Sequence, residues 1–287
     1  MRKKLIAFIQ LIKPLNSSKS TLYYGFCSFM GSLLAASWTI PLAKSFVIAL
    51  AITLSAFAVY ALNDIYDVEI DSINASERPI PSRVISIAEA KAFTTVLFVS
   101  SLLVALSAGI YAIVFTMLFS ILGIMYSIPR IRFKDGYFAN ACWGLGIAMA
   151  VLGGASVTAI NTNALVAAFA LAFLTAGCGL TKDLKDIEGD KALNIHTIPI
   201  LLGEKRAIKL MTIMSIIGFP ILFLNMVLSR INIAYLITIG LTIGFFGYSL
   251  AVLYRNPGSK IIYKKAYKIQ AASGFLIIMA FIFCALI

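Results

Sequence analysis

Two acidic segments of the chain repeat one spacing of carboxylates. Residues 64–71 read Asp-Ile-Tyr-Asp-Val-Glu-Ile-Asp, and residues 183–190 read Asp-Leu-Lys-Asp-Ile-Glu-Gly-Asp. Residues i, i+3 and i+7 of a helix fall within a stripe of about 60°, so each segment is expected to present three aspartates on one face. Glu69 and Glu188 point about 140° away from the first aspartate and are left out of the predicted site.

Six converging carboxylates repel one another unless a counter-ion holds them together. Divalent cations with oxygen ligands are the natural partner, and Mg²⁺ that holds a diphosphate is a common biological form. A solvated acidic surface would also explain the acidity, but it does not explain the identical spacing in two loops. The predicted metal ligands among the acids are Asp64, Asp67, Asp71, Asp183, Asp186 and Asp190, of which Asp64, Asp67, Asp183 and Asp186 are the expected catalytic residues.

Basic residues close to the acids are the predicted diphosphate ligands, because cationic side chains, arginine above all, bind phosphate oxygens well. These residues are Arg78, Arg130, Lys182 and Lys191. Arg132 and Lys185 are interpreted instead as topological anchors. The only histidine, His196, has no cysteine or second histidine beside it and is interpreted as a loop or packing residue.

The rest of the chain is apolar and indicates an integral membrane protein. Of its 287 residues, 61% are hydrophobic and 13% are charged, whereas soluble domains average about 25% charged residues. The net charge of +12 therefore does not indicate a nucleic-acid partner. The four cysteines lie in apolar runs without metal-ligand spacing and are expected to pack as small apolar residues. Because a spanning helix needs about 20 apolar residues, nine spans are predicted, at residues 21–36, 40–62, 91–108, 110–126, 138–160, 163–181, 207–229, 232–254 and 267–286.

The basic residues predict the orientation of these spans. Of the 24 Lys and Arg residues, all but Lys44 and Arg230 fall on one side, in the N-terminal segment or in alternate loops. The positive-inside rule places that side in the cytoplasm, which puts the N-terminus inside and the C-terminus outside the cell membrane. All twelve acidic residues fall on the same side. The first residues, Met1 to Lys19, are expected to lie along the membrane surface as a short basic amphipathic stretch.

These motifs resemble those of the UbiA-type intramembrane prenyltransferases over nearly the whole chain. The resemblance rests on Asn63-Asp64-x-x-Asp67-x-x-x-Asp71, on Arg78-Pro79-Ile80-Pro81-Ser82, on Tyr126-Ser127-x-Pro129-Arg130 and on Asp183-x-x-Asp186-x-Glu188-Gly189-Asp190-Lys191. It implies an all-α fold, residues 1–287 forming one domain of nine transmembrane helices around a central cavity with cytoplasmic cap loops. It also implies two Mg²⁺ ions, transfer of a polyprenyl group from its diphosphate to a lipophilic acceptor, and roles for Asn63 at the metal and Tyr126 at the diphosphate. In this chain Arg130 stands where the family has lysine in the third motif.

Within the family, the residues around the second acidic segment most resemble archaeal digeranylgeranylglyceryl phosphate synthases, which implies geranylgeranylglyceryl phosphate as the acceptor and an ether-lipid precursor as the product. The acceptor's own phosphate then needs separate cations, for which the candidates are Arg83, Lys91 and Lys134. Three alternatives stay open. One is prenylation of an aromatic ring such as 4-hydroxybenzoate in quinone biosynthesis, the second is a cation transporter or channel, and the third is a scaffold protein with a relic site.

Overall fold

The computed structural model describes residues 2–13, 21–36, 40–228 and 233–286. Arg230, one of the two basic residues predicted on the outer side, and Lys19 of the N-terminal stretch lie outside these residues. Every regular element of the described part is helical, in agreement with the predicted all-α class. The helices are α1 (Arg2–Ile12), α2 (Leu22–Ala35), α3 (Leu42–Tyr66), α4 (Val68–Asn74), α5 (Ile87–Ala108), α6 (Ile110–Ser127), α7 (Ala139–Ala155), α8 (Thr162–Ala192), α9 (Ile198–Leu202), α10 (Glu204–Leu228), α11 (Ile233–Arg255) and α12 (Lys260–Leu286), with a 3₁₀ turn η1 (Phe133–Asp135).

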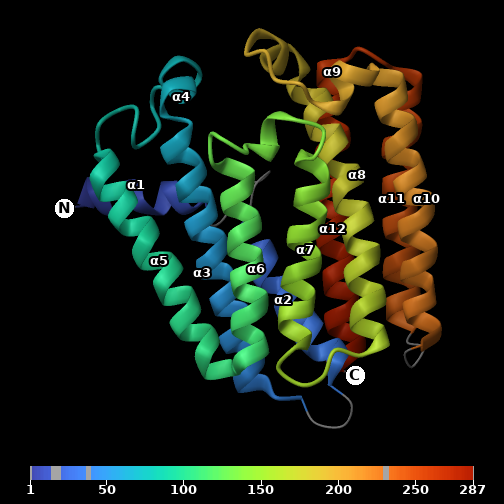
Figure 1. Cartoon of the computed structure of the whole chain (residues 1–287). Coiled ribbons are helices and arrows are strands. Elements are labelled where there is room, and N and C mark those ends of the chain that lie inside the picture. Colours follow the sequence, from blue (N-terminus) through green and yellow to red (C-terminus); the bar gives the residue numbers. More distant parts are fainter. Residues whose placement is uncertain (1, 14–20, 37–39, 229–232, 287) are drawn as a thin grey trace.

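Each of the nine predicted spans falls on one long helix of the bundle (Figure 1). Seven of these, α3, α5, α6, α8, α10, α11 and α12, are long and apolar enough to cross a membrane. The other two, α2 and α7, are apolar but have only 14 and 17 residues. The chain is thus a multi-pass membrane protein, and the count of nine spans stays a prediction.

The two helices that carry the acidic segments extend beyond the apolar runs that predict them. The second predicted span ends at residue 62, but α3 continues to Tyr66, and α8 continues from the predicted end at 181 to Ala192. Asp67 interrupts the first segment with φ −96° and ψ 4°, so that α4 starts as a separate helix. The expectation of one helix through residues 64–71 is therefore wrong at Asp67, although its N–H still donates to the carbonyl of Asn63 at 3.0 Å.

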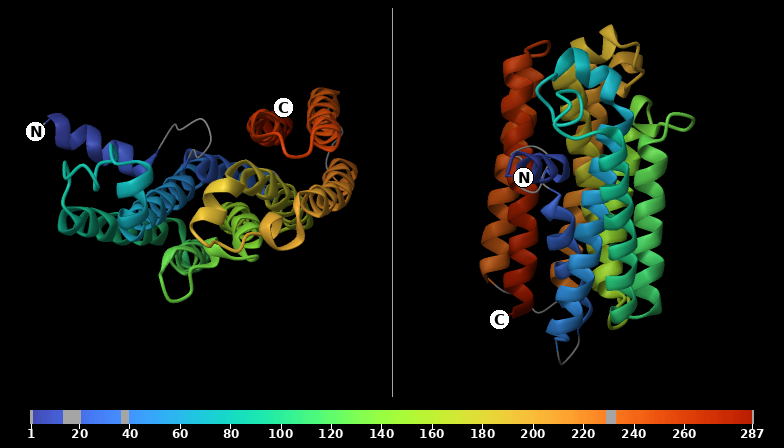
Figure 2. Two further views of the ribbon diagram at one scale, coloured as in Figure 1. Left: turned by 90° about the horizontal axis from the view of Figure 1, so that it is seen from above. Right: turned by 90° about the vertical axis from the view of Figure 1, so that its left-hand side faces the viewer.

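The N-terminal helix α1 lies across the bundle, whereas the long helices run along it (Figures 1 and 2). Its Leu11 is buried, and the ring of Phe8 packs at a tilt against that of Phe93 of α5, with ring centroids 4.7 Å apart. Leu5 and Ile6 are exposed, as an apolar face turned to lipid would be. Viewed from above, α11 and α12 stand at one end of a curved row of helices, and α12 also packs against α2 and α8.

Glycines allow α2, α7 and α8 to pack with their backbones almost in contact. A Cβ atom added at Gly154 of α7 would lie 1.7 Å from the carbonyl oxygen of Ser28 in α2. At Gly31 it would lie 2.0 Å from the carbonyl oxygen of Val151, and at Gly144 2.4 Å from that of Ala172. Helices in lipid associate through such close packing, because the lipid is itself apolar and burying apolar side chains between helices gives little hydrophobic stabilisation.

We therefore expect Gly154→Ala to destabilise the protein, because the added methyl group can be placed only by separating α2 from α7. The expected loss in unfolding free energy is about 2 kcal/mol, typical of overpacking, and it is measured by thermal unfolding of the detergent-purified protein. Gly244→Ala in α11 is the matched control, because nothing lies within 4 Å of the added Cβ there. Equal melting temperatures for the two variants would show that the α2–α7 contact is not tight.

Candidate active site

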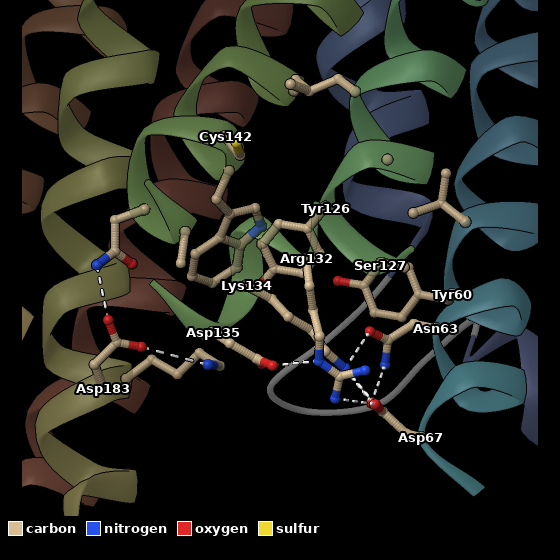
Figure 3. Close-up of a pocket in the computed structure, with 18 of the residues that line it drawn as sticks. Tyr60, Asn63, Asp67, Tyr126, Ser127, Arg132, Lys134, Asp135, Cys142 and Asp183 are labelled. Carbon is tan, nitrogen blue, oxygen red and sulfur yellow. Dashed lines mark hydrogen bonds and ion pairs between the residues drawn. The ribbon is translucent and has the colours of Figure 1, made fainter. Parts of the chain in front are cut away.

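A cavity of about 260 Å³ opens between α3, α6, α7 and α8, at the end of the bundle where both acidic segments lie (Figure 3). Trp143 donates a hydrogen bond to the hydroxyl of Tyr24 at 2.8 Å. Tyr24 in turn packs edge-on against Phe119, with centroids 5.1 Å apart. Six aromatic side chains thus form part of the wall, and charged side chains lie at the mouth. The aromatic lining residues are Tyr24, Tyr60, Phe119, Tyr126, Trp143 and Tyr267.

Asp67, from the first acidic segment, is held at the mouth of the cavity by three polar side chains. The amide of Asn63, one turn earlier in α3, donates to Asp67 Oδ2 at 2.9 Å. Lys134 Nζ contacts both carboxylate oxygens, at 2.5 Å from Oδ2, and Arg132 Nη2 donates to Oδ1 at 3.0 Å. Burial lowers the pKa of Lys134, and the neighbouring Asp67 opposes that shift.

Asp64 and Asp71 lie on the same face as Asp67 but outside the cavity lining. Lys13, the residue after α1, donates to Asp64 at 2.5 Å. Arg78 donates to Asp71 at 2.5 Å and lies 3.7 Å from Asp64. Burial raises the pKa of Asp71, and its bond from Arg78 counters that shift. The three aspartates thus share a face, as their spacing predicts, and each is paired with a cation.

The second acidic segment lies on one continuous helix, α8, on the opposite side of the cavity from Asp67 (Figure 3). Asp183 is buried, accepts a hydrogen bond from Asn140 of α7 at 2.8 Å and lies 3.5 Å from Lys182 Nζ. Asp190 also lines the cavity. Asp186 does not line it and pairs with Lys185 at 2.9 Å. Of the three aspartates, two therefore face the cavity.

A buried polar cluster next to Lys182 fixes the position of α8. Thr181 donates to Gln270 of α12 at 2.7 Å, and Gln270 donates to Ser249 of α11 at 3.0 Å. Each of these polar groups is buried, so each needs its partner. The cluster therefore joins three helices one residue before the Lys182–Asp183 pair.

Two loops come together over the mouth of the cavity. Arg132 adopts a left-handed backbone, with φ 41°, which lets the chain between α6 and α7 fold back toward α3. The N–H of His196, after α8, donates to the carbonyl of Asp135 at 3.0 Å. Figure 3 shows Arg132 and Asp135 between Asp67 and Asp183. The exposed side chain of His196 does not line the cavity, which agrees with its interpretation as a loop residue.

The structure separates the predicted cationic ligands into three groups. Lys182 and Lys134 line the cavity, as does the ring of Tyr126. Arg78 contacts acids just outside the lining. The side chains of Arg130, Lys191, Arg83 and Lys91 are exposed and do not line it. The excluded residues Glu69 and Glu188 are exposed, and Glu188 pairs with Lys260.

Two cations in the cavity lining were missed by the sequence interpretation. Arg132, interpreted as an anchor, bonds to Asp67. Nothing in the sequence between Ser127 and Lys134 distinguishes Arg132 from Arg130 as a contact of the site. Lys13 reaches Asp64 from a distance of 51 residues along the chain, which only a folded structure reveals.

The oxygen donors at the mouth fit Mg²⁺ by their chemistry. Asp67, the amide oxygen of Asn63 and, across the cavity, Asp183 and Asp190 are hard ligands, which this ion prefers. In the described part of the chain, no three Asp, Glu, His or Cys side chains are gathered closely enough to hold an ion by themselves. Mg²⁺ commonly binds one or two carboxylates together with substrate phosphates and water, so the arrangement suits an ion that arrives with a diphosphate.

Comparison with known proteins gives consistent matches over most of the chain. A model of the UbiA prenyltransferase family matches residues 24–285. Digeranylgeranylglyceryl phosphate synthase of Sulfolobus acidocaldarius is 32% identical over 201 residues, which are 69% of this chain and 70% of the relative. The synthase of Methanocaldococcus jannaschii is 26% identical over 98% of this chain and 96% of its own length.

Solved structures show the same fold. A structure of digeranylgeranylglyceryl phosphate synthase aligns with a TM-score of 0.80 at 26% identity, covering 99% of both chains. A UbiA homolog from Archaeoglobus fulgidus, solved with GPP and Mg²⁺ bound, aligns with a TM-score of 0.72 at 22% identity. That alignment covers 95% of this chain and 99% of the homolog.

Proposed function

Because this chain belongs to the UbiA prenyltransferase family, we propose that it transfers a geranylgeranyl group from its diphosphate to the free hydroxyl of geranylgeranylglyceryl phosphate. The observation that carries this proposal is the aromatic cavity whose mouth holds Asp67 and Asp183 with the cations between them. Its relatives named digeranylgeranylglyceryl phosphate synthase support ether-lipid synthesis as the setting. Membership of a prenyltransferase family, with every acid outside the nine predicted spans, argues against a cation channel or a scaffold.

The mouth of the cavity is the proposed seat of the donor diphosphate. Mg²⁺ supplies positive charge that neutralises the diphosphate and favours its departure. We propose one ion beside Asn63, Asp64, Asp67 and Asp71, and a second beside Asp183, Asp186 and Asp190. Arg132, Lys134 and Lys182 would contact the diphosphate oxygens from the lining, where preorganised charge is most effective. Arg78, Arg130 and Lys191 would act from farther out.

The aromatic wall is the proposed seat of the reacting carbon. When the C–O bond of the donor breaks, the electron pair leaves with the diphosphate and an allylic cation remains. The faces of Tyr60, Tyr126 and Trp143 can stabilise that cation, and the enclosed wall keeps water away from it. The acceptor hydroxyl then forms the new C–O bond and releases its proton.

The acceptor must also place its phosphate at the cytoplasmic end, because its hydroxyl has to lie within about 3.5 Å of the donor carbon. Among the three predicted cations, Lys134 bonds to Asp67 and so belongs with the diphosphate. Arg83 and Lys91 remain the candidates for the acceptor phosphate. The proposed orientation has α1 and the acidic segments on the cytoplasmic side of the cell membrane and the C-terminus outside, which the distribution of basic residues supports.

Product analysis tests this function. Purified protein given Mg²⁺, geranylgeranyl diphosphate, geranylgeranylglyceryl phosphate and 4-hydroxybenzoate together is expected to form the doubly geranylgeranylated glyceryl phosphate, detected by mass spectrometry. Chelation of Mg²⁺ should stop its formation. Prenylated hydroxybenzoate formed at an equal or higher rate would reject the lipid acceptor in favour of the aromatic one and leave the prenyltransferase activity standing.

A further inference from the structure

Each aspartate of the first acidic segment is already neutralised by a side chain. Lys13 bonds to Asp64, and Lys134 bonds to both oxygens of Asp67. Both lysines are largely buried, with side-chain exposures of 12% and 13%, and so are their partner carboxylates. A buried carboxylate without a counter-charge is strongly destabilising, so these pairs explain how adjacent acids can remain charged side by side.

The same oxygens are the ones that a divalent ion needs. A lysine ammonium at hydrogen-bonding distance from a carboxylate occupies the position from which a metal would bind it, and its charge repels the metal. The described acids also do not gather into a group of three that could hold an ion alone. In this arrangement the lysines and the metal compete for Asp64 and Asp67.

The two lysines differ from the arginines of the site in their reach and freedom. The lysine ammonium is a compact charge on a flexible four-carbon chain. The planar guanidinium group of arginine instead donates several hydrogen bonds in fixed directions, which restricts its movement. Lys13 and Lys134 both line the cavity in which a diphosphate would lie, while Arg78 does not. Arg132 also lines the cavity, but its guanidinium group is held by both Asp67 and Asp135. A small rotation of either lysine stem therefore moves its charge from a carboxylate to a neighbouring anion in the cavity.

We propose that Lys13 and Lys134 are exchangeable counter-ions, which neutralise Asp64 and Asp67 in the free protein and move to the donor diphosphate when Mg²⁺ takes those carboxylates. This inference rests on the proposed prenyl diphosphate donor. In both states every anion keeps a cation, because the metal replaces the lysine on the aspartate as the lysine pairs with the diphosphate. Metal and diphosphate therefore bind together, and each strengthens the binding of the other by the same factor.

The test measures metal and diphosphate binding separately, without turnover. Mn²⁺ binding to the purified protein is followed by electron paramagnetic resonance in the absence of any diphosphate. Binding of inorganic pyrophosphate is measured by calorimetry at saturating Mg²⁺. We expect Lys13→Gln and Lys134→Gln each to bind Mn²⁺ alone about five- to tenfold more tightly than the unaltered protein and pyrophosphate about tenfold more weakly, a coupling of ordinary size.

Two further variants serve as controls. Lys260→Gln removes the same charge and frees Glu188, an exposed acid that pairs with Lys260 at 2.6 Å outside the cavity, so neither affinity should change. Lys134→Arg keeps the charge and should leave Mn²⁺ binding weak. Because the two lysines lie on different segments, each Gln variant tests the exchange by itself, and thermal unfolding shows which of them folds.

The outcomes separate the exchange from simpler explanations. If the Gln variants bind Mn²⁺ no more tightly than the unaltered protein, the lysines do not compete with metal and the proposal is overturned. Tighter Mn²⁺ binding with unchanged pyrophosphate binding would show that the lysines compete with the metal but do not move to the diphosphate, which also overturns the proposal. If Lys260→Gln changes both affinities as Lys13→Gln and Lys134→Gln do, the changes come from the lower net charge of the protein, and the proposal is overturned. Failure of the unaltered protein to bind pyrophosphate with Mg²⁺ would count against the proposed donor itself.

Discussion

Asp67→Asn and Asp183→Asn are each expected to reduce turnover by about a thousandfold or more while the purified protein stays folded. Each change removes a charged oxygen ligand at the mouth of the cavity and its share in neutralising the diphosphate, an electrostatic contribution that often dominates catalysis. Asparagine keeps the size of the side chain, and the freed Lys134 or Lys182 can still reach water at the mouth. Prenyl transfer is measured with radiolabelled donor, and folding by thermal unfolding in detergent.

The glutamates inside the same segments provide matched controls. Glu69→Gln and Glu188→Gln should keep most of the activity, because both side chains are exposed and neither lines the cavity. If these variants were as inactive as the aspartate variants, the assignment of one helix face to the site would be wrong. Asp64→Asn and Asp186→Asn extend the test to the two expected catalytic aspartates that do not line the cavity.

Lys182→Gln is expected to reduce kcat/KM for the donor by about a hundredfold, the usual scale for loss of one well-placed donor to a developing charge. Lys182 lines the cavity beside Asp183 and is the only cation of α8 in its lining among the described residues. Steady-state kinetics at varied donor concentration measure the effect. A fall in kcat with KM unchanged would place the contact in the transition state alone.

Lys191→Gln is the comparison for Lys182→Gln, because the sequence predicts the same role for both lysines and the structure places only Lys182 in the cavity lining. Both lysines flank the second acidic segment and both are predicted from the sequence to bind diphosphate. The side chain of Lys191 is exposed and lies outside the lining, so its loss should change kcat/KM less than threefold, as expected for a screened surface charge. Equal losses for the two lysines would mean that the last turn of α8, where Lys191 lies, also reaches the substrate.

The fold could be predicted well because lipid leaves few choices. Apolar runs of about 20 residues must form helices in lipid, and each predicted span falls on one helix of the bundle. The ends of α3 and α8 could not be predicted from hydropathy, because there the helix continues as a polar one. Placing residues on an ideal helix of 3.6 residues per turn fails at Asp67, because the helix breaks at that residue and starts again at Val68.

Of the six aspartates predicted for the site, Asp67, Asp183 and Asp190 line the cavity, and the cations that meet them were predicted only in part. The aspartates of each segment are close neighbours along the chain, so their spacing already brings them near one another even where the helix is interrupted at Asp67. The cations arrive from loops and from α1, so their positions depend on how separate segments fold together. Arg132 reaches Asp67 because its left-handed backbone turns the chain, and Arg130, two residues earlier, stays exposed. No local pattern distinguishes these two arginines.

The glycine contacts between α2, α7 and α8 also bear on how such a sequence changes over evolutionary time. Where an added methyl group would meet backbone, as at Gly154 and Gly31, we expect any substitution to destabilise the helix packing and to be selected against. In α11, Gly240 and Gly244 have open space where a side chain would begin, and substitutions can accumulate. Related chains are thus expected to differ more often at Gly240 and Gly244 of α11, while α2, α7 and α8 keep their glycines at these contacts.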